Sequence, residues 1–364
     1  MIHVVKRKDM PLAQALAIRF GIIVLALVVC GVITALATGL NPIAVYGTMI
    51  QGSFGSPRKV WILLHNIALL LCVSLALTPA FRMKFWNLGG EGQVLAGGLA
   101  AAACMVCLGD KVPNVALLAI MFVASIAAGA LWAAIPAIFK ARFNTNETLF
   151  TLMMNYVAIQ IVAYFVIVWE NPKGSGTIGI INQKSEAGWL PVVGGNKYTL
   201  VVILVALLTA AMYVYLNYSK QGYELSVVGE SPSTARYVGI KVDRVIVRTL
   251  ILSGAICGFA GMLLVAGSAH TLTTSIAAGR GFTAVMVSWL AKFNPAVMVG
   301  SSFLLEFMGS GAGEIATTYG LNHSFGDILT GIILFFIIGT EFFITYRVVF
   351  SSKKKASEKE QGNV

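Results

Sequence analysis

Residues 60–81 read VWILLHNIALLLCVSLALTPAF and contain no Asp, Glu, Lys or Arg. An α-helix needs about 20 predominantly apolar residues to cross a bilayer, so this stretch predicts a membrane-spanning helix. Six further stretches lack the four charged residue types over a comparable length: 20–57, 92–109, 112–139, 148–169, 198–219 and 249–279. The sequence therefore predicts an all-α, polytopic membrane protein.

The composition excludes several classes of protein. Of the 364 residues, 57% are hydrophobic and only 11% are charged, against about 25% charged in an average soluble domain. A cytosolic enzyme, a secreted module or a disordered chain of this composition would expose large apolar patches to water. The net charge of +11 does not indicate nucleic acid binding, because the basic residues lie between apolar runs rather than on one surface. Cys104 and Cys107 lie in an apolar run, so we interpret them as packing residues and expect no metal site.

The C-terminal part is more interrupted. We interpret 281–291 and 293–308 as short or tilted elements and 327–346 as a span despite Glu341, which brings the expected number of crossings to ten. With ten crossings, most of the 26 Lys and Arg residues fall on segments of one side, and this side is the cytoplasm. Both termini are then cytoplasmic. The expected organisation is a cytoplasmic segment 1–19, a transmembrane domain 20–346 and a basic tail 347–364.

Two connections are longer than hairpins. The segment 170–197 is expected outside, and the segment 219–248, the most polar part of the chain, is expected inside. Ser231-Pro232 is a favourable helix start and Gly239 a favourable stop, so a short cytoplasmic helix is predicted over 232–238. Composition alone leaves open whether this helix is an ordinary loop element or docks on a cytoplasmic partner.

Two clusters interrupt the apolar runs. In Asn87-Leu-Gly-Gly-Glu-Gly-Gln93, three glycines in four positions disfavour a continuous helix. Gly279-Arg-Gly-Phe282 interrupts the chain about half its length later. Interrupted helices with polar side chains mark substrate sites in transporters, and the spacing suggests an inverted repeat. A plain cytoplasmic turn is the alternative for the first cluster.

Other polar residues lie within or near the predicted spans. Asn155 and Glu306 are the stronger candidates, and hydrogen bonding between helices is the competing explanation. The chain contains no GxxxxGK[ST], HExxH or GxSxG motif, so we expect neither an ATPase nor another enzyme activity.

Four motifs in the same order resemble a known family. Phe85-Trp-Asn-Leu-Gly-Gly-Glu-Gly-Gln93 resembles "FNIGxEGQ", and Thr145-Asn-Glu-Thr-Leu-Phe-Thr-Leu-Met-Met-Asn-Tyr-Val-Ala158 resembles "xNEVxxTLMLNYIA". Gly229-Glu-Ser-Pro-Ser-Thr-Ala-Arg-Tyr-Val-Gly-Ile240 resembles "GxNxxAAxYxGI". Gly279-Arg-Gly-Phe282 with Leu290-Ala-Lys-Phe-Asn-Pro295 resembles "GxGFxxIAVALLGxxNP". The chain resembles permease subunits of ABC importers in the branched-chain amino acid/ribose/nucleoside superfamily, and the first motif favours the nucleoside branch.

The resemblance implies a multi-pass subunit in the cell membrane that moves nucleosides inward by alternating access. A simple-sugar permease is the main alternative, and an ion-coupled secondary transporter is a third. The implied partners are a cytosolic ATP-binding subunit, a second permease subunit, an extracytoplasmic substrate-binding protein and the lipid bilayer. No cofactor is expected in this chain, because ATP and Mg would be bound by the partner ATPase.

The resemblance also assigns residues. It turns the predicted helix at 232–238 into a coupling helix that docks on the ATPase, through Ser233, Arg236, Tyr237, Gly239 and Ile240. For the substrate path we expect Asn87, Glu91, Gln93, Asn155, Phe282 and Glu306. Amide and carboxylate groups would hydrogen-bond sugar hydroxyls or a base edge, and Phe282 would stack on a base.

Overall fold

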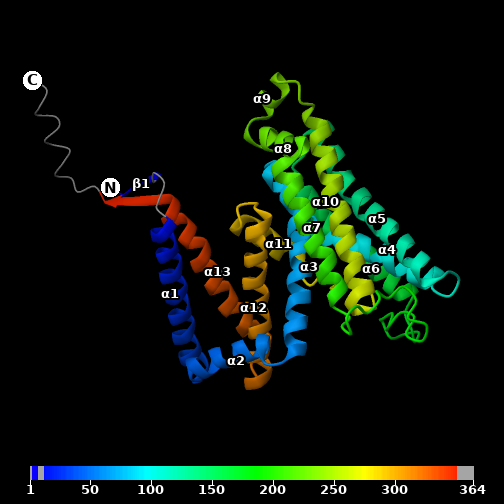
Figure 1. Cartoon of the computed structure of the whole chain (residues 1–364), viewed down its shortest axis with the longest axis horizontal. Coiled ribbons are helices and arrows are strands. Elements are labelled where there is room, and N and C mark those ends of the chain that lie inside the picture. Colours follow the sequence, from blue (N-terminus) through cyan, green and yellow to red (C-terminus); the bar gives the residue numbers. More distant parts are fainter. Residues whose placement is uncertain (1, 7–11, 351–364) are drawn as a thin grey trace, which may run out of the picture. The chain divides into compact units, whose positions relative to one another are not determined.

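The computed structural model describes residues 2–6 and 12–350 (Figure 1). The chain divides into two compact units. We call Val60–Glu306 the central unit, and Met1–Lys59 with Phe307–Val364 the terminal unit. The predicted basic tail from residue 351 onward lies outside the described residues.

Seven helices in the described part are long and apolar enough to cross a membrane, and they correspond to the seven uncharged stretches between residues 20 and 279. They are α1 (Leu12–Thr38), α3 (Pro57–Arg82), α4 (Gly90–Leu108), α5 (Asn114–Phe143), α6 (Glu147–Val168), α7 (Thr199–Tyr218) and α10 (Val242–Leu264), which the π-helical turn η1 (Val265–Ala269) continues. The chain is a multi-pass membrane protein. The number of ten crossings, the orientation of the termini and the inverted repeat stay predictions.

The C-terminal part differs from the expectation. The short element α11 (Arg280–Leu290) agrees with it, but α12 (Pro295–Tyr319) has 25 residues and extends well beyond the predicted element 293–308. Glu314, on this extension, forms an ion pair with Lys59 at 2.9 Å, which offsets its charge within the helix. The last helix, α13, covers His323–Thr345.

One strand pairing departs from the all-α prediction. β1 (Ile2–Lys6) and β2 (Tyr346–Phe350) pair antiparallel, with Ile2 opposite Phe350 and Lys6 opposite Tyr346. Both segments contain adjacent valines, and β-branched and aromatic residues favour extended structure. The sequence predicted no strand at either end of the chain, and the helices of the described part still make the fold all-α.

The terminal unit is fastened by contacts between its two sequence segments. After α1, Asn41 caps the short helix α2 (Pro42–Phe54) by accepting a hydrogen bond from the Ile43 backbone. The Thr48 and Tyr319 hydroxyls lie 3.2 Å apart, and the Cys30 thiol points to the Leu329 carbonyl oxygen at 3.8 Å. These contacts join α1–α2 to α12–α13, and the Lys59–Glu314 pair joins the start of α3 to α12.

The centre of the central unit is built from α4, α5 and α10, which pack closely on one another. Gly258 of α10 lies against the Ser125 carbonyl oxygen of α5, where an added Cβ would collide with the backbone. Gly97 of α4 lies against Gly258 in the same way. Because lipid is as apolar as a protein core, membrane helices associate through such close backbone approaches at small residues.

Short helices and a long connection form the two ends of the central unit. Figure 1 shows the short helices α8 (Lys220–Glu230) and α9 (Pro232–Tyr237) at one end of this unit, and the 169–198 connection at the other. α3 and α10 are mostly buried, whereas α5, α6 and α7 expose apolar side chains. The exposed apolar faces of the last three fit contact with lipid.

Candidate functional site

The first interruption lies between α3 and α4, and the hydrogen bonds of Asn87 hold it in place. This side chain is fully buried. Its Oδ1 accepts hydrogen bonds from the Gly89 backbone N–H at 3.0 Å and from Gln93 Nε2 at 3.2 Å. Its Nδ2 donates to Ser253 Oγ of α10 at 3.2 Å. Asn87 thus ties the unwound segment to α4 and α10.

Helix α6 supports the same interruption from another side. Asn155 Oδ1 accepts from the Gly92 N–H and Nδ2 donates to the Leu88 carbonyl oxygen, both at 2.8 Å. Thr151 Oγ1 accepts from the Leu88 N–H at 3.1 Å. Backbone groups outside regular structure are costly in an apolar surrounding unless they are paired. Asn155 and Thr151 supply this pairing.

Glu91 joins the first interruption to the second. Its buried carboxylate accepts hydrogen bonds from the Gly279 N–H at 2.9 Å and the Gly281 N–H at 2.8 Å. These are free donors at the first turn of α11, where a negative charge is also favoured by the helix dipole. The two interruptions, predicted independently, therefore meet inside the central unit.

The other predicted path residues lie differently. Phe282, directly after this junction, is 46% exposed. Glu306 on α12 faces Arg280, with 4.0 Å between Oε1 and Nε. Gln93 Oε1 is buried without a hydrogen-bond partner in the described part of the chain. The structure thus gathers Asn87, Glu91, Gln93 and Asn155 around the junction, and brings Glu306 to it through Arg280.

Sequence reasoning passed over several residues of this region. Arg280 was quoted as part of a motif but given no role, although a basic residue after a 31-residue uncharged stretch was a usable signal. Ser253 is one of the polar residues within the predicted spans, but neither it nor Thr151 carries a signal that singles it out. Hydroxyls on apolar helices are common, and their partners lie far away in sequence.

The helix predicted over 232–238 is confirmed as α9 (Pro232–Tyr237), and its cytoplasmic location stays a prediction. Ser231 Oγ accepts from the Thr234 N–H at 3.2 Å, which is an N-cap. Gly239 has φ +84°, a conformation that glycine adopts most readily and that ends the helix.

The surface of α9 is divided. Ala235 is buried, whereas Ser233, Arg236 and Gly239 are exposed, and Tyr237 is 92% exposed. Ile240 is partly exposed. A fully exposed aromatic ring beside a basic side chain on a capped helix presents a candidate docking face.

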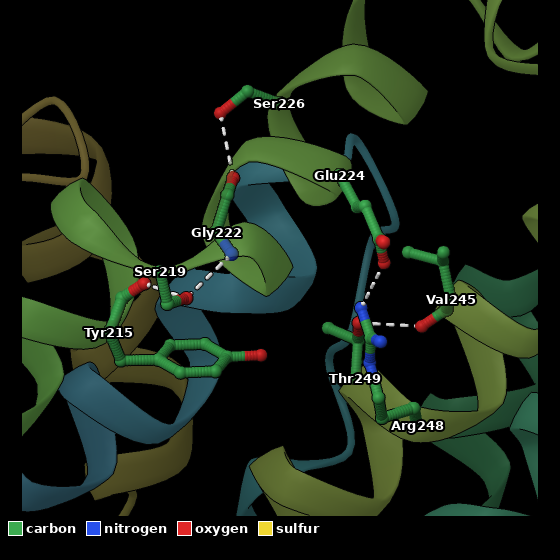
Figure 2. Close-up of polar contacts among 8 residues, drawn as sticks. All are labelled: Tyr215, Ser219, Gly222, Glu224, Ser226, Val245, Arg248 and Thr249. Atoms are coloured by element: carbon green, nitrogen blue, oxygen red, sulfur yellow. Dashed lines mark hydrogen bonds and ion pairs between the residues drawn. The ribbon is translucent and has the colours of Figure 1, made fainter. Parts of the chain in front are cut away.

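Helix α8, which was not predicted, contacts both α9 and the membrane helices, and Figure 2 shows its contacts with α7 and α10. Glu224 Oε2 pairs with Arg248 Nη2 of α10 at 2.9 Å. Ser219 Oγ accepts from the Gly222 N–H at 2.9 Å and starts the helix where α7 ends. Gly229 lies so close to the Arg82 carbonyl oxygen that a Cβ would collide with it. A displacement of α9 would therefore reach both α10 and the end of α3.

The opposite end of the central unit is closed by the 169–198 connection. The Trp189 ring stacks on His270, with centroids 3.8 Å apart, and its Nε1 donates to the Ile181 carbonyl oxygen at 3.0 Å. Glu170 accepts from the Gly174 and Gly176 N–H groups, and these two hydrogen bonds hold the pKa of the carboxyl below its usual range. These contacts give the 169–198 connection a defined conformation where it meets the membrane helices.

Comparison with known proteins gives a family match. The family described as branched-chain amino acid transport system / permease component matches residues 60–338. This range contains all four motifs, both interruptions and α9.

Three relatives are similar over nearly their whole length. The glucose ABC transporter permease protein of Haloferax volcanii is 31% identical, over 92% of this chain and 90% of its own. The guanosine ABC transporter permease protein of Bacillus subtilis is 28% identical, over 92% and 94%. The nucleoside ABC transporter permease protein of Lactococcus lactis subsp. cremoris is 24% identical, over 95% of each chain.

Proposed function

The chain belongs to the family of branched-chain amino acid transport system permease components, and from this premise we propose that it moves nucleosides into the cell as the membrane subunit of an ABC importer. The observation that carries the nucleoside assignment is the full-length similarity to guanosine and nucleoside permeases. The glucose permease relative, at 31% identity, favours a simple sugar as the second candidate.

The junction of the two interruptions supports a transport role for the central unit. Unwound backbone at membrane depth is retained where it borders a cavity or path. Asn87, Glu91, Gln93 and Asn155 hold this backbone in place in our proposal, because nearly all their polar atoms are bound within the chain. Phe282 and Glu306 are left as candidates for direct contact with substrate.

The α9 surface is assigned to an ATP-binding subunit. In this proposal, Tyr237 and Ile240 supply the apolar contacts, Arg236 a charged one, and Ser233 and Gly239 the shape of the helix ends. ATP and Mg bind to the partner. Closure of the ATPase moves α9, and α8 passes the movement to α10 through Glu224–Arg248 and to α3 through the Gly229 contact. Alternating access follows from this movement.

Two further partners complete the proposed complex. An extracytoplasmic binding protein would deliver substrate at the 169–198 connection, whose base is fixed by the Trp189–His270 stack. A second permease subunit, the same or a related chain, would share the path.

The test is uptake of labelled guanosine and labelled glucose in cells lacking this chain, with and without ATP depletion. Loss of ATP-dependent guanosine uptake on deletion is expected. Loss of glucose uptake alone would move the chain to the sugar candidate. Uptake that survives ATP depletion and collapses with the proton gradient would contradict the ABC mechanism.

Coupling is tested by Arg236→Glu and by Gly239→Leu, which strains the positive-φ backbone. Both variants are expected to reach the membrane and to uncouple ATP hydrolysis from uptake, because only the docking helix is altered. Lys111→Glu, in the turn after α4, is the matched charge-reversal control. Normal uptake with both α9 variants would refute the docking role.

A further inference from the structure

Arg280 lies at the centre of a small charged cluster in the central unit. It is the first residue of α11, directly beside the Glu91 junction. Its Nη2 donates to Asn66 Oδ1 of α3 at 3.3 Å, and its Nε lies 4.0 Å from Glu306 Oε1 of α12. The side chains of Arg280 and Glu306 are only 16% and 17% exposed. Three helices thus bring one cation, one anion and one amide together.

His65, the neighbour of Asn66 on α3, adds a further polar group. Its ring lies within electrostatic range of Arg280 and packs against Tyr198 with centroids 5.0 Å apart. The residue is only 3% exposed, yet neither ring nitrogen has a hydrogen-bond partner in the described part of the chain. A buried imidazole without partners is rare, because it forfeits the hydrogen bonds that water gave it.

Arg280 is incompletely paired as well. Its Nε, although buried, forms no hydrogen bond among the described residues. The contact with Glu306 is long, whereas a guanidinium and a carboxylate that serve structure form short and often bidentate hydrogen bonds. The cluster therefore holds unused donors and unused acceptor capacity at one place, which is the property of a site that a ligand completes.

The chemistry of the cluster selects the class of ligand. A carboxylate accepts hydroxyl hydrogens, and a guanidinium donates to hydroxyl oxygens. Arg280 and Glu306 cancel in charge, so this pair favours neither an anion nor a cation, and Lys197 is the other charged residue that acts on His65. An imidazole and an amide add both donors and acceptors. Adjacent hydroxyl groups, each donor and acceptor at once, match this set.

We propose that Arg280, Glu306, Asn66 and His65 form a site for the vicinal hydroxyls of a neutral sugar moiety, either the ribose of a nucleoside or a hexose. The inference rests on the proposed import function and names the part of the substrate that the chain recognises by hydrogen bonding.

The experiment compares substrates with and without the hydroxyls. Cells lacking the chain are complemented with wild type, Glu306→Gln or Arg280→Gln. Uptake of guanosine is measured against 2′,3′-dideoxyguanosine, and uptake of glucose against 2-deoxyglucose. We expect wild type to prefer the hydroxylated member of one pair by about tenfold, the value of a hydrogen bond to a charged group. In both variants this ratio should fall towards 1.

The control is Glu314→Gln, which removes a carboxylate from another ion pair of α12 and should keep the wild-type ratio. An equal fall in uptake of both substrates, with an unchanged ratio, would assign Glu306 to structure and overturn the inference. A wild type that transports without preferring hydroxylated substrates would overturn it too. If Glu306→Gln does not accumulate in the membrane, the uptake ratio of hydroxylated to deoxy substrate is measured in Asn66→Ala instead. It should fall towards 1, and a wild-type ratio would overturn the inference.

The guanosine and glucose pairs distinguish the two sources of the hydroxyls. Absence of guanosine and glucose uptake in wild type would overturn the proposed function, and the inference with it. Normal wild-type uptake with unchanged ratios in the variants would overturn the inference alone.

Discussion

The two polar regions around α11 differ in how their hydrogen bonds are satisfied. At the junction, each oxygen of the Glu91 carboxylate accepts a backbone N–H, and Asn155 pairs through both ends of its amide. Gln93 Oε1 is the exception there, because it is buried without a partner among the described residues. Next to the junction, Arg280 and His65 keep buried nitrogens without partners. Burial of a polar residue therefore does not by itself indicate its role: a group with partners supports the fold, whereas a group without them is open to a further partner.

The largest effect on stability is expected from Glu91→Ala. It leaves the Gly279 and Gly281 N–H groups unpaired at the start of α11. Losing two hydrogen bonds to a charged group costs about 3–5 kcal/mol of unfolding free energy. Thermal unfolding of the purified chain in detergent measures this, with Glu91→Gln expected in between. Wild-type stability combined with lost uptake would instead make Glu91 a substrate ligand and break the comparison.

A smaller loss is expected from Asn155→Ala. The change removes two uncharged hydrogen bonds, to the Gly92 N–H and the Leu88 carbonyl oxygen, and costs about 2 kcal/mol. The same unfolding measurement applies. Gln160→Ala, on the same helix and not in the junction, is the control. Equal effects of the two changes would show that the junction bonds contribute nothing specific.

Glu306→Gln is expected to change stability less than Glu91→Ala, since the contact of Glu306 with Arg280 is long and the Gln side-chain oxygen can still accept from the guanidinium. Its effect should appear in the uptake ratio rather than in unfolding. This outcome would sharpen the comparison, because Glu91 and Glu306 are both carboxylates in the membrane domain. A destabilisation as large as that of Glu91→Ala would place both residues in the same structural class.

The smallest effect on stability is expected from Glu224→Gln. Its ion pair with Arg248 is short, but the Arg248 side chain is 37% exposed, and such pairs contribute about 0.5 kcal/mol. ATP-driven uptake should nevertheless fall, because the pair links α8 to α10. Unfolding and uptake measured on the same variant separate the two effects. Unchanged uptake would leave the Gly229 contact as the connection to the membrane helices.

Much of the site could be located from the sequence, but the partners of its residues could not. The glycines and polar residues at 87–93 and 279–282 predicted two interruptions, because glycine inside a helix lowers the stability of that helix. The two oxygens of Glu91 accept hydrogen bonds from residues about 190 positions away, and these bonds depend on how α4 and α11 pack. Glu306 was a candidate, yet Arg280, Asn66 and His65 joined it only in three dimensions.

The membrane class, the seven long spans, both ends of α9 and the family could be predicted from the chain alone, since apolar length, capping residues and motifs are local properties. The full length of α12, the β1–β2 pairing, the attachment of α8 and the division between satisfied and unsatisfied polar groups could not. Each of these depends on hydrogen bonds or ion pairs, which need a partner at about 3 Å. The positions of those partners are set by the packing of helices distant in sequence.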